Sequence, residues 1–441
     1  MGTILSGIGS RYFGRKRTLM MTQAVALLAL MVLRFAYSTP MFYLGSFLGG
    51  CTGGIVNAVI PTYVAEINQP RIRKFTGSFI NVGFAFGFVY TKFVGVFTNW
   101  RDTVSCMFAL PILGVILFMF CPESPSWYIS KGREDMAVLT MKKLRGDVVV
   151  ANSEITRIKE NLERQQRTNK GMSEYSYIRS QINIVTKGTF LRPCLVVTIM
   201  MSIFWQWSGG RHLIFYTDDI LTTFEIPIPP TWMAAAIGGY QFLVALFGIF
   251  LSSIIPRRAY YMGSGVLLCL GNVILGVSVH LLRYEFFVNF LKINDGLKWL
   301  PVCGFMIYFL GYQLGFMSVG FMLLGEILPS NGKEIGGCII IQCMNVSFFL
   351  SLKSSNWMQD IMGLDGLFCL FAIIAFASII FGYFVIPETF GKTLEEIEDH
   401  YRKICYPAVY KASVAVNEVI NMSFVSDNGL TLEHKQSKTN L

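Results

Sequence analysis

Long apolar runs separated by short polar loops make up most of the chain. A helix that spans a bilayer needs about 20 mostly apolar residues to cross about 30 Å of hydrocarbon, and about ten runs reach that length. They lie near residues 18–37, 41–65, 76–98, 103–121, 191–210, 234–255, 259–282, 299–325, 335–355 and 364–386. The pattern predicts an all-α polytopic membrane protein.

Two polar segments interrupt this pattern, at about residues 122–188 and from about residue 390 to the end. The first contains a charged helical pattern over residues 153–170, and Ser124 followed by Pro125 is typical of a helix N-cap. Residues 393–396, Thr-Leu-Glu-Glu, form a capping box. We expect short cytoplasmic helices that either latch the inner end of the bundle or only cap the spans.

Composition and charge agree with a membrane protein. Apolar residues make up 53% of the chain and charged residues only 15%, which is too few for the surface of a soluble protein of 441 residues. The net charge of +10 is concentrated in alternate loops, beginning with Arg11, Arg15, Lys16 and Arg17, whereas the loops near 38–40, 222–232 and 356–363 carry no Lys or Arg. By the positive-inside rule the basic loops are cytoplasmic. The charge therefore indicates orientation and no nucleic-acid partner.

Three pairs of loop motifs recur in the same order roughly 250 residues apart, as in a duplicated chain. They are GSRYFGRKR at 9–17 with SSIIPRRAYY at 252–261, AEINQPRIRK at 65–74 with GEILPSNGKE at 325–334, and PESPSW at 122–127 with PETFGK at 387–392. A parallel duplication about an axis along the membrane normal explains them. We expect an N-terminal membrane half at 1–121, a cytoplasmic linker at 122–188, a C-terminal membrane half at 189–389 and a cytoplasmic tail at 390–441.

Residues 2–10 form a further apolar segment that ends at the first basic cluster. At about 1.5 Å per residue it crosses only about half of the hydrocarbon. We interpret it as the cytoplasmic end of a second span. About 11 helices are then expected in a two-by-six plan, with the first helix and part of the second missing.

Together, these motifs resemble the sugar porter family of the major facilitator superfamily, and within it the arthropod facilitated trehalose transporters. The resemblance covers about residues 1–403. It rests on residues 14–16 (GRK), 61–67 (PTYVAEI), 122–125 (PESP), 208–209 (SG), 214–216 (IFY), 325–329 (GEILP), 387–389 (PET) and 391–398 (GKTLEEIE). It implies a major facilitator fold and facilitated diffusion of a hexose or trehalose by alternating access. The family's usual location is the plasma membrane.

Charged residues gather where the spans meet the cytoplasmic loops. An unpaired charge near hydrocarbon is costly, so opposite charges there should pair. For the acidic residues we favour a network that closes the inner gate, as the resemblance implies, whereas for each basic residue anchoring alone is an equal alternative. The candidates are Arg15, Lys16, Glu66, Arg73, Glu123, Arg257, Arg258, Glu326, Lys333 and Glu388.

Several amides lie inside apolar runs. A sugar presents many hydroxyl groups, and amides can both donate to them and accept from them. Taken singly, each amide could equally join neighbouring helices. The candidate substrate-binding residues are Asn81, Gln206, Arg211, Gln241, Gln313, Phe321 and Asn345.

The chain departs from the family in two of these spans. The family's seventh span has two adjacent Gln before Ser-Gly-Ile-Asn, but residues 205–211 are Trp-Gln-Trp-Ser-Gly-Gly-Arg. Its tenth span has Gly-Pro-x-Pro-Trp, but residues 317–321 are Met-Ser-Val-Gly-Phe. A guanidinium in a span costs about 2.5 kcal/mol or more. Arg211 is therefore expected either to pair locally or reach the outer surface, or to face the substrate path.

Three functions stay open on this evidence. The leading one is a sugar transporter; the others are a non-transporting or degenerate homologue and a transporter of an anionic solute selected by Arg211. The sequence contains no nucleophile–base set, metal-ligand cluster or phosphate loop, so an enzyme is not expected, nor is a cofactor. The expected partners are a small solute and the lipid bilayer.

Overall fold

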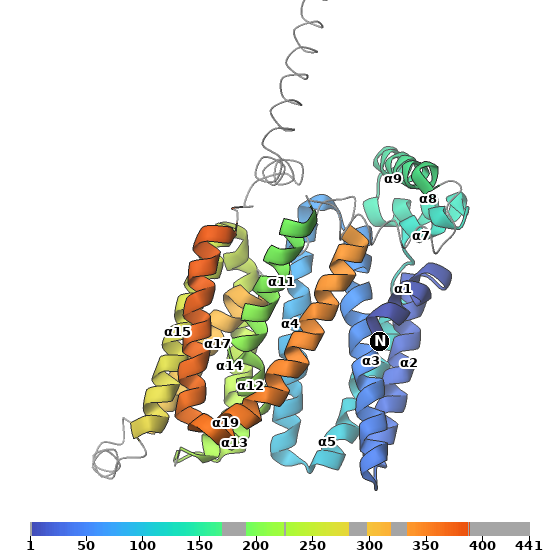
Figure 1. Cartoon of the computed structure of the whole chain (residues 1–441). Coiled ribbons are helices and arrows are strands. Elements are labelled where there is room, and N and C mark those ends of the chain that lie inside the picture. Colours follow the sequence, from blue (N-terminus) through green and yellow to red (C-terminus); the bar gives the residue numbers. More distant parts are fainter. Residues whose placement is uncertain are drawn as a thin grey trace, which may run out of the picture.

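The computed structural model describes residues 2–169, 191–224, 226–281, 298–318, 333–386 and 388. Within these ranges every regular element is a helix, and the long helices stand side by side as a bundle (Figure 1). Eight of the described helices are long and apolar enough to cross a membrane. The prediction of an all-α polytopic protein is confirmed.

The first half of the bundle contains six helices. They are α1 Gly2–Tyr12, α2 Arg15–Arg34, α3 Thr39–Ile67, α4 Pro70–Phe97, α5 Trp100–Met107 and α6 Ala109–Phe120. The predicted run at 103–121 is interrupted at Phe108, between α5 and α6. Pro111 explains the break, because it has no N–H to donate to the carbonyl of Met107 four residues earlier.

Two short helices and one of 22 residues follow outside the bundle. They are α7 Pro125–Ser130, α8 Glu134–Arg145 and α9 Val148–Asn169. The backbone N–H of Trp127 donates to Ser124 Oγ at 3.4 Å, which confirms the predicted N-cap. In Figure 1 these helices sit beside one end of the bundle, next to α1. We call this the basic end, and the end at α5 and α13 the opposite end.

The second half contains α11 Leu191–Trp207, α12 Gly210–Phe215, α13 Thr217–Thr222, α14 Pro230–Ile254, α15 Arg257–Leu281, α17 Leu300–Gly311, the π-helix η2 Tyr312–Met317 and α19 Lys333–Val385. Two helices of α19 meet at Gly363, whose φ is 75°. The first continues through residues 356–362, where a loop was expected. The part of the run at 299–325 beyond Ser318 lies outside the described residues.

The run at 191–210 does not form one straight span. α11 ends at Trp207, and Gly209 has a φ of 94°, a left-handed conformation that favours glycine. The break exposes the Ser208 carbonyl, which accepts hydrogen bonds from Asn272 Nδ2 and the Tyr308 hydroxyl, each at 3.2 Å. Side chains from two other helices thus satisfy the broken helix end.

Candidate substrate site and charge networks

Three of the predicted amides lie together between the two halves. Asn81 lies near the middle of α4, Gln241 lies on α14 and Gln313 lies on η2. Asn81 Nδ2 donates to the backbone oxygen of Gln313 at 3.4 Å, and Gln313 Nε2 donates to Gln241 Oε1 at 3.4 Å. The three residues are 5% exposed or less. We call them the amide triad.

The triad leaves hydrogen-bonding capacity unused. Asn81 Oδ1, Gln241 Nε2 and Gln313 Oε1 are buried without a partner among the described residues, as is the neighbouring Tyr312 hydroxyl. Each such atom costs about 1–3 kcal/mol unless a ligand or water satisfies it. The set combines acceptors, a donor and a hydroxyl that can do either, so it suits a ligand that presents several hydroxyl groups.

The π-helix positions one member of the triad. π-helical turns are rare and are frequently found at functional sites. η2 follows directly on Gly311, the last residue of α17, where a Cβ would stand 2.7 Å from the Ser264 carbonyl oxygen, so the chain lies close to α15 where η2 begins. The Tyr312 ring also stacks on Tyr308 with 6.0 Å between centroids. Sequence reasoning missed Tyr308 and Asn272. Both support the helix break, and Tyr308 also supports the site through Tyr312. Asn272 is an amide inside an apolar run, the same signal that marked the triad.

Gln206 and Arg211 form a second polar contact. Because the chain turns at Gly209, Arg211 Nε reaches Gln206 Oε1 at 3.3 Å, and its guanidinium carbon lies 4.9 Å from the centre of the Phe348 ring. Gln206 is buried, and its backbone oxygen accepts from Ser351 Oγ at 2.8 Å. This is the local pairing that the sequence offered as one alternative for Arg211.

The remaining substrate candidates are not part of the triad. Asn345 is half-buried on α19, and no hydrogen bond joins its side chain to the other amides within the described ranges. Phe321 lies outside the described residues. The neighbouring His212 is buried, with Nδ1 3.0 Å from Ser355 Oγ and its ring 4.9 Å from that of Tyr216.

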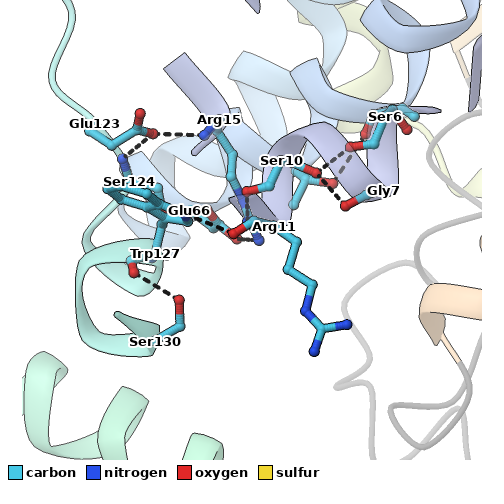
Figure 2. Close-up of polar contacts among 12 residues, drawn as sticks. Ser6, Gly7, Ser10, Arg11, Arg15, Glu66, Glu123, Ser124, Trp127 and Ser130 are labelled. Carbon is cyan, nitrogen blue, oxygen red and sulfur yellow. Dashed lines mark hydrogen bonds and ion pairs between the residues drawn. The ribbon is translucent and has the colours of Figure 1, made fainter. Parts of the chain in front are cut away.

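A carboxylate organises the basic end of the first half. Glu123 Oε1 accepts from the backbone N–H groups of Arg15 at 2.8 Å and Ser124 at 3.0 Å (Figure 2). It also accepts from the backbone N–H of Lys16 at 3.0 Å. The Arg15 guanidinium pairs with Glu66 at 3.1 Å, and Ser124 Oγ also donates to Glu66. The start of α2, the end of α3 and the start of α7 are thereby tied together.

The second half repeats this arrangement. Glu388 Oε1 accepts from the Arg257 backbone N–H at 3.0 Å, and its Oε2 accepts from that of Arg258 at 3.2 Å. The Arg257 guanidinium donates to the Ser252 carbonyl, just as Arg15 Nη1 donates to the Ser10 carbonyl at 3.0 Å. Two of the three loop pairs read from the sequence thus have matching contacts.

The networks differ from the expected ion pairs in one respect. Glu123 and Glu388 bind backbone N–H groups at the first turns of α2 and α15, where unpaired donors and the positive end of the helix dipole favour a carboxylate. Lys16 instead donates to the Met119 carbonyl at 3.0 Å, and Arg258 donates to that of Tyr383. Glu326 and the side chains of Arg73 and Lys333 lie outside the described part of the chain.

Contacts between the halves occur at several depths. Near the opposite end, Lys92 of α4 pairs with Asp218 of α13, and the rings of Phe97 and Trp232 meet edge to face at 5.3 Å. Gln342 Nε2 of α19 also donates to Thr3 Oγ1 of α1 at 2.6 Å. Together with the Asn81–Gln313 hydrogen bond of the triad, these contacts join the two halves.

Comparison with known proteins agrees with this architecture. The family model described as "Sugar (and other) transporter" matches residues 1–401. Facilitated trehalose transporter Tret1 of Drosophila virilis is 30% identical over 405 residues, which are 90% of this chain and 42% of that protein. Trehalose transporter 1 of Drosophila melanogaster is 30% identical over 407 residues, 90% of this chain and 45% of that protein. The chain therefore spans under half the length of these relatives.

Solved structures show the same fold. The proton:xylose symporter XylE, bound to 6-bromo-6-deoxy-D-glucose, gives a TM-score of 0.71 at 19% identity and covers 91% of this chain and 86% of its own. XylE of E. coli in an inward-open conformation gives 0.66 at 19% identity, covering 90% and 85%. These structures show that the chain has the major facilitator fold, and the match over residues 1–401 shows that it belongs to the family of sugar (and other) transporters.

Proposed function

We propose that the chain transports a small polyhydroxyl solute, a hexose or trehalose, by facilitated diffusion with alternating access. The amide triad carries this proposal. Asn81 comes from the first half and Gln241 and Gln313 from the second, and each keeps a buried polar atom without a partner. A sugar hydroxyl both donates and accepts, so one sugar can satisfy donors and acceptors on both halves. Named relatives that transport trehalose support the solute class.

The proposal includes an orientation and a domain plan. The basic end faces the cytoplasm, because Lys and Arg are concentrated in its loops. The membrane halves are residues 1–121 and 189–389, and the linker at 122–188 and the tail at 390–441 are cytoplasmic. The plasma membrane is the proposed location. Transport requires the contacts between the halves, including Lys92–Asp218 near the opposite end, to break and re-form as the halves move.

Uptake of radiolabelled trehalose and glucose into liposomes containing the purified chain tests the proposal. We expect Asn81→Ala and Gln241→Ala each to raise the concentration for half-maximal uptake about fivefold, since one hydrogen bond contributes about 1 kcal/mol. Asn152→Ala is the matched control, because Asn152 is an exposed amide on α9. If liposomes that contain the unaltered chain take up sugar no faster than empty liposomes, the proposal is contradicted. That result would favour a non-transporting homologue.

Arg211 favours a second candidate, an anionic solute. Its guanidinium contacts Gln206 and Phe348 and has no carboxylate partner within the described ranges, since Asp218 pairs with Lys92. Arg211→Asn separates the candidates. If Arg211 selects an anion, the variant loses competition by organic anions; if Arg211 obstructs a sugar site, sugar uptake rises. Unchanged uptake with unchanged competition assigns Arg211 to local packing.

A further inference from the structure

A cavity at the basic end, separate from the amide triad, is lined by cations and aromatic rings. Its volume is about 250 Å³, and its walls are Tyr12, Phe13, Arg17, Trp127, Lys131 and Arg133. It lies between the turn that joins α1 to α2 and the turn that joins α7 to α8. No acidic side chain contributes to these walls.

The cations of this cavity have no carboxylate partner within the described ranges. The Lys131 ammonium lies 5.6 Å from the centre of the Tyr12 ring, and neither Arg17 nor Arg133 forms an ion pair there. The nearest acid in sequence, Glu134, is engaged by Lys159 at 2.7 Å. Three like charges around one cavity repel one another unless an anion neutralises them.

The walls are held in place by the network of the first half. Trp127 is 6% exposed, and its Nε1 donates to the Arg11 carbonyl at 3.3 Å, which joins α7 to α1. Gly132 has a φ of 71°, and this left-handed residue turns the chain so that Arg133 N donates to the Tyr128 carbonyl at 2.9 Å. Lys131 and Arg133 are thus fixed on one rim of the cavity and Arg17 on the other.

We propose that this cavity binds a phosphate-bearing anion. Arginine forks and a lysine ammonium are the groups that bind phosphate oxygens best, and the exposed positions of all three allow entry from water. Tyr12 and Phe13 are 62% and 47% exposed beside them, as aromatic residues are at a membrane–water interface. The phosphate can therefore come from an anionic lipid headgroup of the cytoplasmic leaflet or from solution.

Titration of the full chain with phosphatidylinositol monophosphate, followed by native mass spectrometry, tests the site. We expect Lys131→Gln with Arg133→Gln to weaken lipid binding about tenfold to thirtyfold, because each surface cation contributes about one factor of five. Lys142→Gln with Lys143→Gln is the matched control: both are exposed on α8 outside the cavity and remove the same charge. Retention of binding by the control pair, with loss by the cavity pair, supports the site.

The source of the phosphate is tested in parallel by the thermal unfolding of the same variants in inorganic phosphate, against chloride of equal ionic strength. Stabilisation that depends on Lys131 and Arg133 assigns a soluble phosphate. Lipid binding that depends on these residues, without stabilisation by phosphate, assigns a headgroup. Equal weakening in both variant pairs would overturn the proposal, because binding would then depend on net charge alone. Weakening in neither pair would also overturn it, because the cavity cations would then not contribute to binding. All four substituted side chains are exposed, so folding is retained and sugar uptake is unaffected.

Discussion

The two halves of the bundle share a motif pattern but are packed very differently. In the second half, 50% of the residues are buried in the apolar stretch of α14 and in that of α15, 72% in that of Leu300–Met317 and 33% in that of Gly336–Val385. In the first half the corresponding shares are 22% for α2, 17% for α3 and for Phe79–Phe97, and 6% for Trp100–Phe120. The large apolar core lies among α11 to α19, whereas the core of α2 and α3 is built on Leu19, Val59 and Tyr63.

Single glycines serve close packing at some positions and not at others. A Cβ at Gly271 of α15 would stand 2.6 Å from Tyr308 Cβ, so glycine there allows α15 and α17 to approach closely. On α3, a Cβ at Gly45 would stand 2.7 Å from Leu33 Cγ, whereas one at Gly50 would meet no described atom within 4 Å. Gly271 and Gly50 therefore give a matched pair of positions for testing how tightly the helices pack.

The comparison teaches that the apolar runs set where helices form but not how tightly they pack. Lipid gives no hydrophobic drive for helices to associate, so close packing and polar contacts must hold them together. The second half has both, whereas the described part of the first half relies more on the network around Glu123 and Glu66. The two halves should then respond differently to the same kind of substitution.

Gly271→Val should have the largest effect. The added side chain would overlap the backbone of Tyr308, and such overpacking costs about 1–3 kcal/mol or more. Gly50→Val is the matched control on α3 and should change stability by no more than a few tenths of a kcal/mol. Thermal unfolding in detergent measures both. Equal losses in the two variants would contradict the difference in packing.

Glu123→Ala should have the next largest effect, and a local one. It leaves three backbone N–H groups without their charged acceptor, and because all three share the one oxygen Oε1, we expect a total loss of about 1.5–3 kcal/mol. We expect faster limited proteolysis within α7–α9, because Glu123 holds the start of α7 against α2. Glu388→Ala removes the equivalent carboxylate of the second half and should leave cleavage in α7–α9 unchanged. Faster cleavage in both variants would show that the two networks are not independent.

Sequence reasoning predicted the features that depend on local pattern. Run lengths gave the spans, the Ser124 cap was confirmed, and three of the five predicted amides lie in the triad. It missed features that need a partner from elsewhere in the fold. The break after Trp207 depends on Asn272 and Tyr308, both distant in sequence. The π-helix that carries Gln313 has no local signal, and the backbone N–H groups that donate to Glu123 could not be told from side-chain partners by charge alone.

Lys92→Met should have the smallest effect on stability of these substitutions. Its main effect should be on the uptake rate. The Lys92–Asp218 pair is partly exposed, at 18% and 39%, so it contributes under about 1 kcal/mol to folding. It joins the two halves, however, whereas the Arg15–Glu66 pair lies within one half. Under the proposed alternating access, breaking it should shift the conformational balance and change the uptake rate by up to about fivefold.

The exchange of charges distinguishes these roles. Lys92→Asp combined with Asp218→Lys should restore the uptake rate, because the pair between the halves is rebuilt with opposite polarity. Arg15→Glu combined with Glu66→Arg should not restore stability, because in the present arrangement Glu66 also accepts from Ser124, and an arginine there cannot. If single and double changes at Lys92 and Asp218 are simply additive, the pair does not couple the halves. Coupling confined to the pair between the halves would mean that polar contacts within a half maintain its structure, while those between halves control its movement.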